Sequence, residues 1–241
     1  MQTVDHSSAV LGIDLHRHAD VEAMSGALAL AVEAALAQAL SVRGEASLAV
    51  AGGRTPLPLF ERLARLPLAW ARVHVTLTDE RVVPVSDPAS NERLVRERLL
   101  RGAAAGARFH PLMNGHEEPD TRAQAAWEQL AWLPRPFDAV VLGLGEDGHI
   151  AGLFADAPAP ALDPAAPPGC VTTTAPVAPV ERLSLNLAAL LDARQLWLVV
   201  VGAAKLAILD EALRPGSSTA LPVRALLKQT VVPVRVEWAP G

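Results

Sequence analysis

A histidine follows a glycine-rich bend near the middle of the chain, and its imidazole is the side chain best suited to chemistry at neutral pH. Residues 140–154 read VVLGLGEDGHIAGLF, with an apolar strand ahead of the bend and His149 directly behind it. An imidazole titrates near neutral pH, so it can take up a proton and return it. The pattern predicts a general base, and Asp147 either orients its ring or only caps the bend.

The same bend matches the dinucleotide-binding pattern G-x-G-x-x-G from Gly143 to Gly148. It does not lie in the first strand–helix–strand unit, and no strand ends in an acidic residue about 20 positions later. We therefore interpret the bend differently. Its backbone N–H groups, Gly145 among them, are candidates for holding a substrate oxygen.

A second glycine-rich turn, at residues 52–55, precedes a segment expected to be helical. Backbone N–H groups at the start of a helix attract anions, and glycine lets a ligand come close. An ordinary strand-to-helix turn has the same composition, so the turn alone leaves phosphate binding open. The residues that would bind a phosphate here are Gly52, Gly53, Arg54 and Thr55.

Charged and polar residues near other strand ends complete the set of candidates. Asp79 and Arg81 belong to a run of three charged residues that follows an expected strand. This run is either a solvated turn or a group of side chains that holds a substrate hydroxyl or oxyanion. Asn91 stands at an expected helix start, where capping is the default role. Arg182 and Lys205 could serve a phosphate, although each alone is by default a solvated surface charge.

No pattern in the sequence indicates a metal site or a covalent nucleophile. His110 and His116 do not flank a third ligand at metal spacing, and the other histidines besides His149 lack a chemical setting. No G-x-S-x-G elbow occurs, and Cys170 lies in an expected loop without a base nearby in sequence. The sequence thus predicts no metal and no cofactor, and a base that acts on water or on a substrate carbon.

The elements that must position these residues alternate along the chain. Residues 1–17 are expected to contain an edge strand, and further strands are expected at residues 47–51, 72–78, 137–142, 171–175, 195–201 and 231–238. Helices are expected at residues 18–42, 57–66, 90–101, 121–133, 203–213 and 222–227, and residues 181–191 are expected to be helical or partly helical. The pattern predicts an α/β fold: a doubly wound, mostly parallel sheet with helices on both faces, in a single domain over residues 1–241. The loops after residues 51, 78, 142 and 201 should then share its carboxyl edge.

Local signals mark several of the expected helix starts. Ser90 is expected to cap the helix behind it, and Thr121 with Gln124 matches a capping box. Thr55 and Pro56 suit the start of the helix expected at residues 57–66. Residues 155–168, rich in proline and alanine, are expected to form an ordered surface loop near the site.

Composition narrows the class of protein. The 241 residues are 51% hydrophobic, enough for a full core, and a net charge of -5 without a basic run argues against general nucleic-acid binding. The first ten residues do not resemble a signal peptide, and the most apolar helical stretch, residues 27–40, is too short to cross a bilayer. A single cysteine suits a reducing compartment. These features predict a cytoplasmic protein that binds neither nucleic acid nor membranes, as a monomer or small homo-oligomer.

Four segments, in this order, resemble the 6-phosphogluconolactonases of the glucosamine-6-phosphate isomerase/6-phosphogluconolactonase family. They are LAVAGGRTPLPLF, TDERVVPVSDPASN, LGLGEDGHIAGLF and ERLSLNLAALLDARQLWLVVVGAAKLAIL, and the resemblance runs from about residue 46 to residue 227. Three residues depart from the family pattern. Arg54 replaces a serine of the phosphate loop, Ile150 replaces a threonine, and Gly152 replaces a serine.

The resemblance implies hydrolysis of the δ-lactone 6-phosphogluconolactone to 6-phosphogluconate, on a fold like that of glucosamine-6-phosphate deaminase, a modified Rossmann arrangement. His149 would activate water, and Arg81 or the backbone donors of the bend would stabilise the oxyanion. The phosphate would lie among residues 52–55, Arg182 and Lys205. Asp79, Asn91 and Gly145 are expected as further substrate contacts, and no cofactor is implied.

Two other functions stay open. A glucosamine-6-phosphate deaminase/isomerase would open the sugar ring and shift a proton between C1 and C2, with Asp79 as base. Arg81, Pro84 and the Leu-Phe pair at residues 153–154 favour the lactonase. A non-catalytic sugar-phosphate sensor would tend to lose the base, whereas His149 is present.

Overall fold

A computed structural model describes residues 13–113, 118 and 121–241. Its main sheet has seven strands, in the order β1-β10-β9-β6-β2-β3-β5, and each neighbouring pair is parallel. The strands are β1 (Asp14–Arg17), β2 (Ala46–Val50), β3 (Val73–Leu77), β5 (Arg108–His110), β6 (Ala139–Gly143), β9 (Leu196–Val201) and β10 (Val234–Ala239). Every residue of β2 and β3 is buried, as expected for strands covered on both faces.

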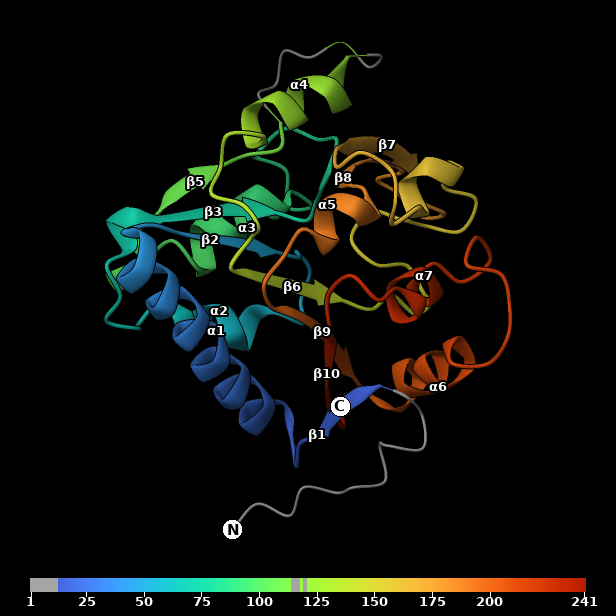
Figure 1. The fold of residues 1–241 in the computed structure, drawn as a ribbon, viewed down its shortest axis with the longest axis horizontal. Helices are drawn as coiled ribbons and strands as arrows, with labels where there is room; N and C mark the ends of the chain where they lie inside the picture. Colours follow the sequence, from blue (N-terminus) through green and yellow to red (C-terminus); the bar gives the residue numbers. More distant parts are fainter. Residues whose placement is uncertain (1–12, 114–117, 119–120) are drawn as a thin grey trace.

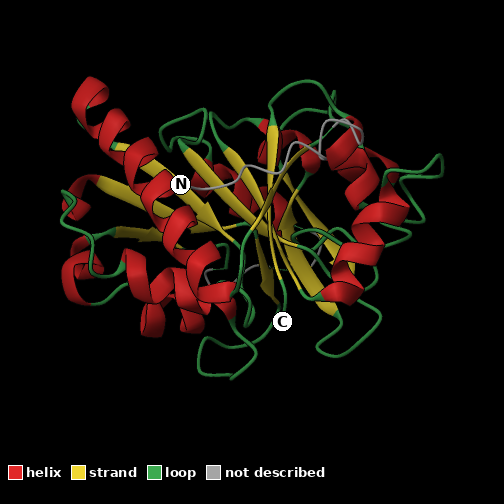
Figure 2. Cartoon of the chain, turned by 90° about the horizontal axis from the view of Figure 1, so that it is seen from below, coloured by secondary structure: helices red, strands yellow, loops and turns green. Residues whose placement is uncertain are grey.

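Seven α-helices connect these strands in the described residues (Figure 1). They are α1 (Val21–Arg43), α2 (Leu57–Leu63), α3 (Asn91–Arg98), α4 (Arg122–Leu130), α5 (Leu187–Leu191), α6 (Ala203–Ala212) and α7 (Val223–Lys228). Figure 2 shows helices on both sides of the strands. The predicted doubly wound, mostly parallel α/β fold is therefore confirmed.

The strand order explains where a ligand can enter. The chain builds outward from β2 through β3 to β5 in one direction, whereas β6, β9, β10 and β1 lie on the other side of β2. The loops that leave the carboxyl ends of β2 and β6 thus diverge. Such a point of reversal opens a crevice at the carboxyl edge of a parallel sheet.

A second, antiparallel sheet lies beside this edge, in the order β4-β8-β7. Its strands are β4 (Asp79–Arg81), β7 (Cys170–Thr174) and β8 (Glu181–Leu185). The charges at residues 79–81, which the sequence left open as a solvated turn or a substrate-holding group, form a strand. Residues 181–191, expected to be helical or partly helical, form β8 and then α5. Charged side chains are compatible with these strands because one face of the small sheet borders the site.

The first helix is longer than the apolar stretch that the sequence suggested. Asp20 caps it, since its Oδ1 accepts a hydrogen bond from the N–H of Ala23 at 2.7 Å, and Gly44 ends it at φ 81°. By length and composition alone, these 23 residues could cross a membrane, a test that a buried core helix also passes. In the fold, Leu28, Val32 and Leu36 are buried and the helix packs on β2 and β10.

The cap predictions had mixed outcomes. Ser90 caps α3, since its hydroxyl accepts a hydrogen bond from the N–H of Arg93 at 3.1 Å. The capping box at Thr121 was wrong, because the backbone of Thr121 is already helical and its side chain caps nothing. Pro56, and not Thr55, stands at the start of α2. The edge strand predicted within residues 1–17 is β1, whereas residues 1–12 lie outside the described part.

Candidate active site

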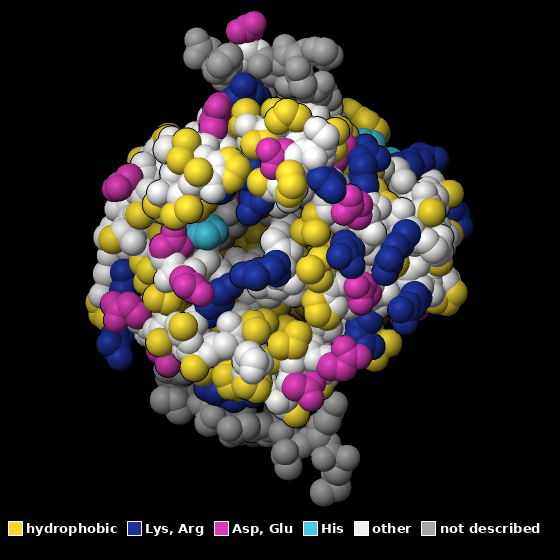
Figure 3. Space-filling model, turned by 180° about the vertical axis from the view of Figure 1, so that it is seen from behind, with side chains coloured by type: hydrophobic (Ala, Val, Ile, Leu, Met, Phe, Trp, Pro, Cys, Tyr) yellow, Lys and Arg dark blue, Asp and Glu magenta, His cyan; other side chains and the backbone are white. Residues whose placement is uncertain are grey.

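A cavity of about 260 Å³ opens at the carboxyl edge of the main sheet. Figure 3 shows a hollowed face whose rim carries a histidine together with Lys and Arg side chains. The four loops that the sequence predicted to meet do meet here. The predicted residues among those that line the cavity are Gly52, Gly53, Arg54, Thr55, Asp79, Arg81, Asn91, Gly145, His149 and Lys205.

His149 is fixed by its neighbour Asp147. The Nδ1 atom of His149 lies 2.5 Å from Oδ1 of Asp147, and the same oxygen accepts the backbone N–H of His149 at 3.2 Å. The hydrogen bond from His149 holds the pKa of Asp147 below its usual value. A carboxylate on Nδ1 keeps the proton there and leaves Nε2 with a free lone pair. Phe154 supports the imidazole, with ring centroids 4.5 Å apart.

Asp79 and Arg81 reach the cavity from β4. Burial raises the pKa of the Asp79 carboxyl, and the nearby charges of Arg81, His149 and Arg182 act in the opposite direction. The guanidinium of Arg81 donates from Nη1 to the carbonyl of Ala89 at 2.5 Å, which holds it at the cavity wall. A buried carboxyl and a cation therefore share the wall with His149.

Arg182 lies directly opposite Arg81 on the ladder between β4 and β8. Like charges directly opposite each other destabilise a sheet, so the pair is evidence of a function that needs positive charge. Burial, and then the charge of Arg81, lowers the pKa of Arg182. Arg182 does not line the cavity, however, and its guanidinium lies 5.8 Å from the ring centroid of Phe154. The structure brings it close to Arg81 rather than into the group around Lys205.

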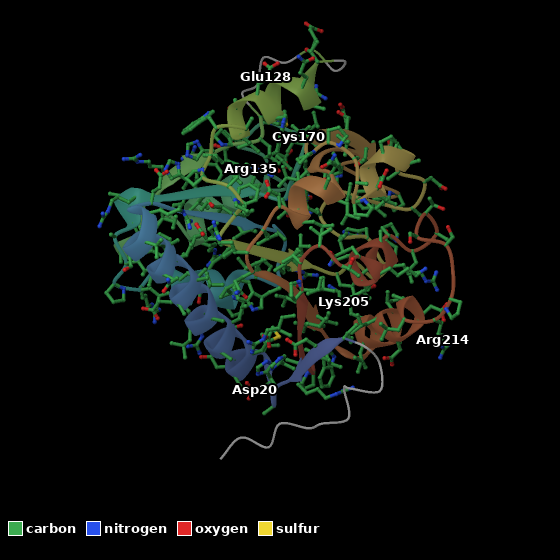
Figure 4. All side chains as sticks on the ribbon, in the orientation of Figure 1. Asp20, Glu128, Arg135, Cys170, Lys205 and Arg214 are labelled. Atoms are coloured by element: carbon green, nitrogen blue, oxygen red, sulfur yellow. The ribbon has the colours of Figure 1, made fainter. Side chains whose placement is uncertain are left out.

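The cavity is lined by three cations and by one carboxyl, that of Asp79. Within the described part of the chain, Arg54, Arg81 and Lys205 form no ion pair, whereas Arg43 and Arg122 each bind a carboxylate. Lys205 lies at the start of α6, beside the strands of the main sheet (Figure 4). Burial lowers its pKa, and the charge of Glu146 opposes that effect. Cations without partners in a partly enclosed cavity favour an anionic ligand.

Asn91 connects β4 to the glycine turn at residues 52–55. Its Nδ2 donates to the carbonyl of Asp79 at 2.9 Å. Its side chain lies so close to Gly52 that a Cβ there would be 1.9 Å from Oδ1 of Asn91. Only glycine can occupy position 52, so the close approach expected of this turn serves Asn91 as well as any ligand.

The sequence left open whether Asp79 or Glu80 fixes Arg81 or another site residue, and Glu80 holds the backbone N–H groups of both Arg81 and Asn91. One oxygen of its buried carboxylate accepts from the N–H of Asn91 and the other from the N–H of Glu92, both at 2.7 Å. A carboxylate at a helix start is favourable. Glu80 therefore anchors α3 to β4.

A larger neighbouring hollow of about 650 Å³ lies beyond Asp147 and Phe154. It is lined by Asp147 and Phe154 and by residues 155–158 and 172–176. The loop predicted at residues 155–168 thus does border the site, and it contains a 3-10 turn, Ala159–Leu162. As for metals, no three His, Cys, Asp or Glu side chains among the described residues form a group that could hold an ion; His6 and His116 lie outside these residues.

Comparisons with known proteins agree with this arrangement. A sequence model of the family described as glucosamine-6-phosphate isomerases/6-phosphogluconolactonase matches residues 19–236. The chain is 41% identical to a 6-phosphogluconolactonase of Rhizobium meliloti (strain 1021). The 232 aligned residues cover 95% of this chain and 100% of that protein. A 6-phosphogluconolactonase structure from Shewanella baltica OS155 has a TM-score of 0.87 at 40% identity, covering 94% of this chain and 97% of the other. A monomeric glucosamine-6-phosphate deaminase, at 18% identity and a TM-score of 0.77, shares the fold; it covers 95% of this chain and 97% of the other.

Proposed function

The chain belongs to the family of glucosamine-6-phosphate isomerases and 6-phosphogluconolactonases, and we propose that it hydrolyses 6-phosphogluconolactone to 6-phosphogluconate. This is the lactone-opening step of the oxidative pentose phosphate pathway. One observation carries the chemical part of the proposal: His149 is tied through Nδ1 to Asp147 at a cavity lined by unpaired cations. A base and positive charge in one place suit water attack on the carbonyl of an anionic lactone.

The reaction follows from these positions. Neutral His149 takes a proton from water on Nε2, and the water oxygen attacks the lactone carbonyl carbon. Asp147 holds the ring and stabilises the imidazolium that forms. Arg81 and backbone N–H groups of the bend stabilise the oxyanion. The N–H of Gly145, a candidate from the sequence, is not among them, because it donates to the carbonyl of His149 at 2.9 Å. When the ring C–O bond breaks, His149 returns its proton to the leaving oxygen. These steps use neither metal nor cofactor.

The substrate phosphate is assigned to the turn at residues 52–55 and to Lys205. Arg54, where the family resemblance predicts serine, adds a further cation to this wall of the cavity. Asp79 and Asn91 lie between the phosphate turn and His149, where they suit the sugar hydroxyls. Arg182 contributes through its charge on Asp79 and Arg81 and has no contact assigned to the phosphate.

The site draws on residues from 51 to 205, which supports one functional α/β unit over residues 1–241. We assign the reaction to the cytoplasm, because a sugar phosphate dianion does not cross a membrane unaided. Neither nucleic acid nor membrane takes part in it. A monomer or a small homo-oligomer is compatible with a site that one chain builds by itself.

The experiment that separates this function from its relative uses two substrates. Freshly prepared 6-phosphogluconolactone should decay faster with the protein than without it, and glucosamine-6-phosphate should release no ammonia above the blank. Ammonia release without lactone decay would instead identify a deaminase. Binding of both sugar phosphates without turnover of either would identify a sensor.

A further inference from the structure

The turn that follows His149 is held from two sides by buried hydroxyl groups. The backbone N–H of Gly152 donates to Oγ of Ser184 at 3.0 Å, and Oγ1 of Thr173 donates to the carbonyl of Gly152 at 2.5 Å. Ser184 in turn donates to the carbonyl of Leu185 at 2.9 Å. Both hydroxyl side chains are buried, with 0% and 5% exposure for Ser184 and Thr173. We call Gly152, Ser184 and Thr173 the hydroxyl clasp.

The position of the clasp in the fold is informative, because it joins the two sheets. His149 and Gly152 lie on the segment that leaves β6 of the main sheet, whereas Ser184 is on β8 and Thr173 on β7 of the small sheet. Ser184 lies directly opposite Asp79 on the ladder between β8 and β4. Thr173 lies opposite Arg182, which lies opposite Arg81. Residues that are opposite or two apart share one face of a sheet. The same face thus carries Asp79, Arg81 and the clasp.

The segment between His149 and Gly152 has an unusual backbone, which makes an external hold necessary. Ala151 has φ 48°, a conformation that costs energy for a residue with a side chain. Ile150 and Leu153 pair across this turn and are fully buried. A Cβ at position 152 would lie 2.9 Å from Cβ of Ser184, so the glycine lets the turn approach β8. The family serine expected at this position would not fit against Ser184.

We propose that Ser184 and Thr173 are positioning residues for His149, because they fix the distance between its imidazole and the cation Arg81 across the gap between the two sheets. Neither hydroxyl lines the cavity with His149, and Thr173 lies on the wall of the neighbouring hollow. The inference rests on the proposed lactonase activity. Loss of one clasp bond lets the turn relax, and misplacement of a catalytic group by about 1 Å can cost roughly 100-fold in rate.

The test compares variants that differ only in the hydroxyl. Ser184→Ala and Thr173→Val remove one hydroxyl each, and Thr173→Val keeps the shape of the side chain. Thr173→Ser keeps the hydroxyl and serves as the conservative variant. Ser47→Ala is a matched control, because Ser47 is also fully buried and its Oγ donates to the carbonyl of Pro134 at 2.8 Å, at the amino end of β2 away from the cavity.

Lactone hydrolysis should show a fall in kcat of roughly 10-fold to 100-fold for Ser184→Ala and Thr173→Val, with KM nearly unchanged. Thr173→Ser and Ser47→Ala should keep the kcat of the unchanged protein. A kcat within twofold of the unchanged protein for Thr173→Val, or an equal loss for Thr173→Ser, would overturn the proposal.

A second readout does not depend on activity. In ¹H–¹³C spectra of the imidazole rings, the His149 signals should move in Ser184→Ala and Thr173→Val and stay in place in Thr173→Ser and Ser47→Ala. If the unchanged protein fails to hydrolyse the lactone, the proposed function fails while these spectra still decide whether the clasp positions His149. Unmoved His149 signals in Thr173→Val would contradict the positioning role.

Discussion

The pair of Asp147 and His149 shows how short a sequence can place a carboxylate against an imidazole. One turn places a carboxylate on Nδ1 of the imidazole and directs the other nitrogen outward. The order of strands and loops predicted that this pair, Arg81 and Lys205 lie at one edge of the sheet, because residues that follow parallel strands meet there. It left open whether Asp147 orients the ring or only caps the bend. The sequence could not predict the contacts of Ser184 and Thr173 with Gly152, because the two residues lie 32 and 21 positions further along the chain. Single hydroxyl residues inside strands carry no local signal.

At the same scale, the role of Lys205 can be tested against the only other lysine of the chain, Lys228. Lys205→Met removes a cation from the cavity and should raise KM for the phosphorylated lactone by roughly 10-fold to 100-fold, the loss expected for one hydrogen bond to a charged group. Lys228→Met should leave KM unchanged, because Nζ of Lys228 binds the carbonyl of Gly216 outside the cavity. Steady-state kinetics would reject the phosphate assignment if both variants kept the original KM.

Among the elements, α3 and β4 form the best-defined unit of the site. Glu80 accepts hydrogen bonds from the backbone N–H groups of Arg81, Asn91 and Glu92, each at 2.7 Å. Burial raises the pKa of Glu80, and these N–H groups act in the opposite direction. The start of α3 therefore depends on one charged acceptor inside the protein, and so does the position of Asn91 beside Gly52.

Glu80→Gln should lower the free energy of unfolding by about 1–3 kcal/mol, since an amide has one acceptor oxygen where the carboxylate has two. The same variant should lose activity, because Arg81 and Asn91 shift with α3. Glu97→Gln is the control: its exposed ion pair with Arg93 contributes about 0.5 kcal/mol or less. Urea unfolding would show equal midpoints for the two variants if Glu80 were only a surface charge.

The elements also show where sequence patterns mislead. Long apolar strands such as β2, β6 and β9 were predicted because they are buried on both faces. The small sheet was only partly predicted, since its strands carry polar residues toward the site and resemble turns or a helix in the sequence. Pairing with distant strands, and not local propensity, decides their structure.

For the molecule as a whole, the division of labour between two sheets is the main feature. The loops of the parallel sheet supply His149 and the glycine turn at residues 52–55, and the small antiparallel sheet supplies Asp79 and Arg81. On β3 and β5 of the main sheet, two histidines form a pair that bears on the stability of the fold. His74 and His110 are joined by a hydrogen bond of 3.0 Å between their ring nitrogens, and Trp132 packs edge-on against both.

This pair predicts how global stability depends on pH. Burial lowers the pKa of both rings below 6.5; for His74 the charge of Glu45 opposes this and that of Arg108 adds to it, and His110 is lowered further by His74 and Arg108. Because each folded-state pKa is depressed, the unfolded chain binds protons first as the pH falls below about 6.5, and stability is lost there.

When the pH is lowered from 7.5, the free energy of unfolding should therefore fall less for the double variant His74→Gln/His110→Gln than for the unchanged protein. Thermal or urea unfolding at each pH measures this difference. The same comparison at pH 8, where both rings are neutral in either state, corrects for lost packing. An equal acid dependence in both proteins would show that other groups control it.

The central measurement is the decay of freshly made 6-phosphogluconolactone at pH 7, followed by NMR with the unchanged protein, with His149→Ala and without protein. The uncatalysed control is essential because a lactone also hydrolyses by itself. We expect clear acceleration by the unchanged protein, and a kcat lower by about 100-fold to 10,000-fold in His149→Ala with little change in KM. A His149→Ala protein that hydrolyses the lactone as fast as the unchanged one would contradict His149 as the base.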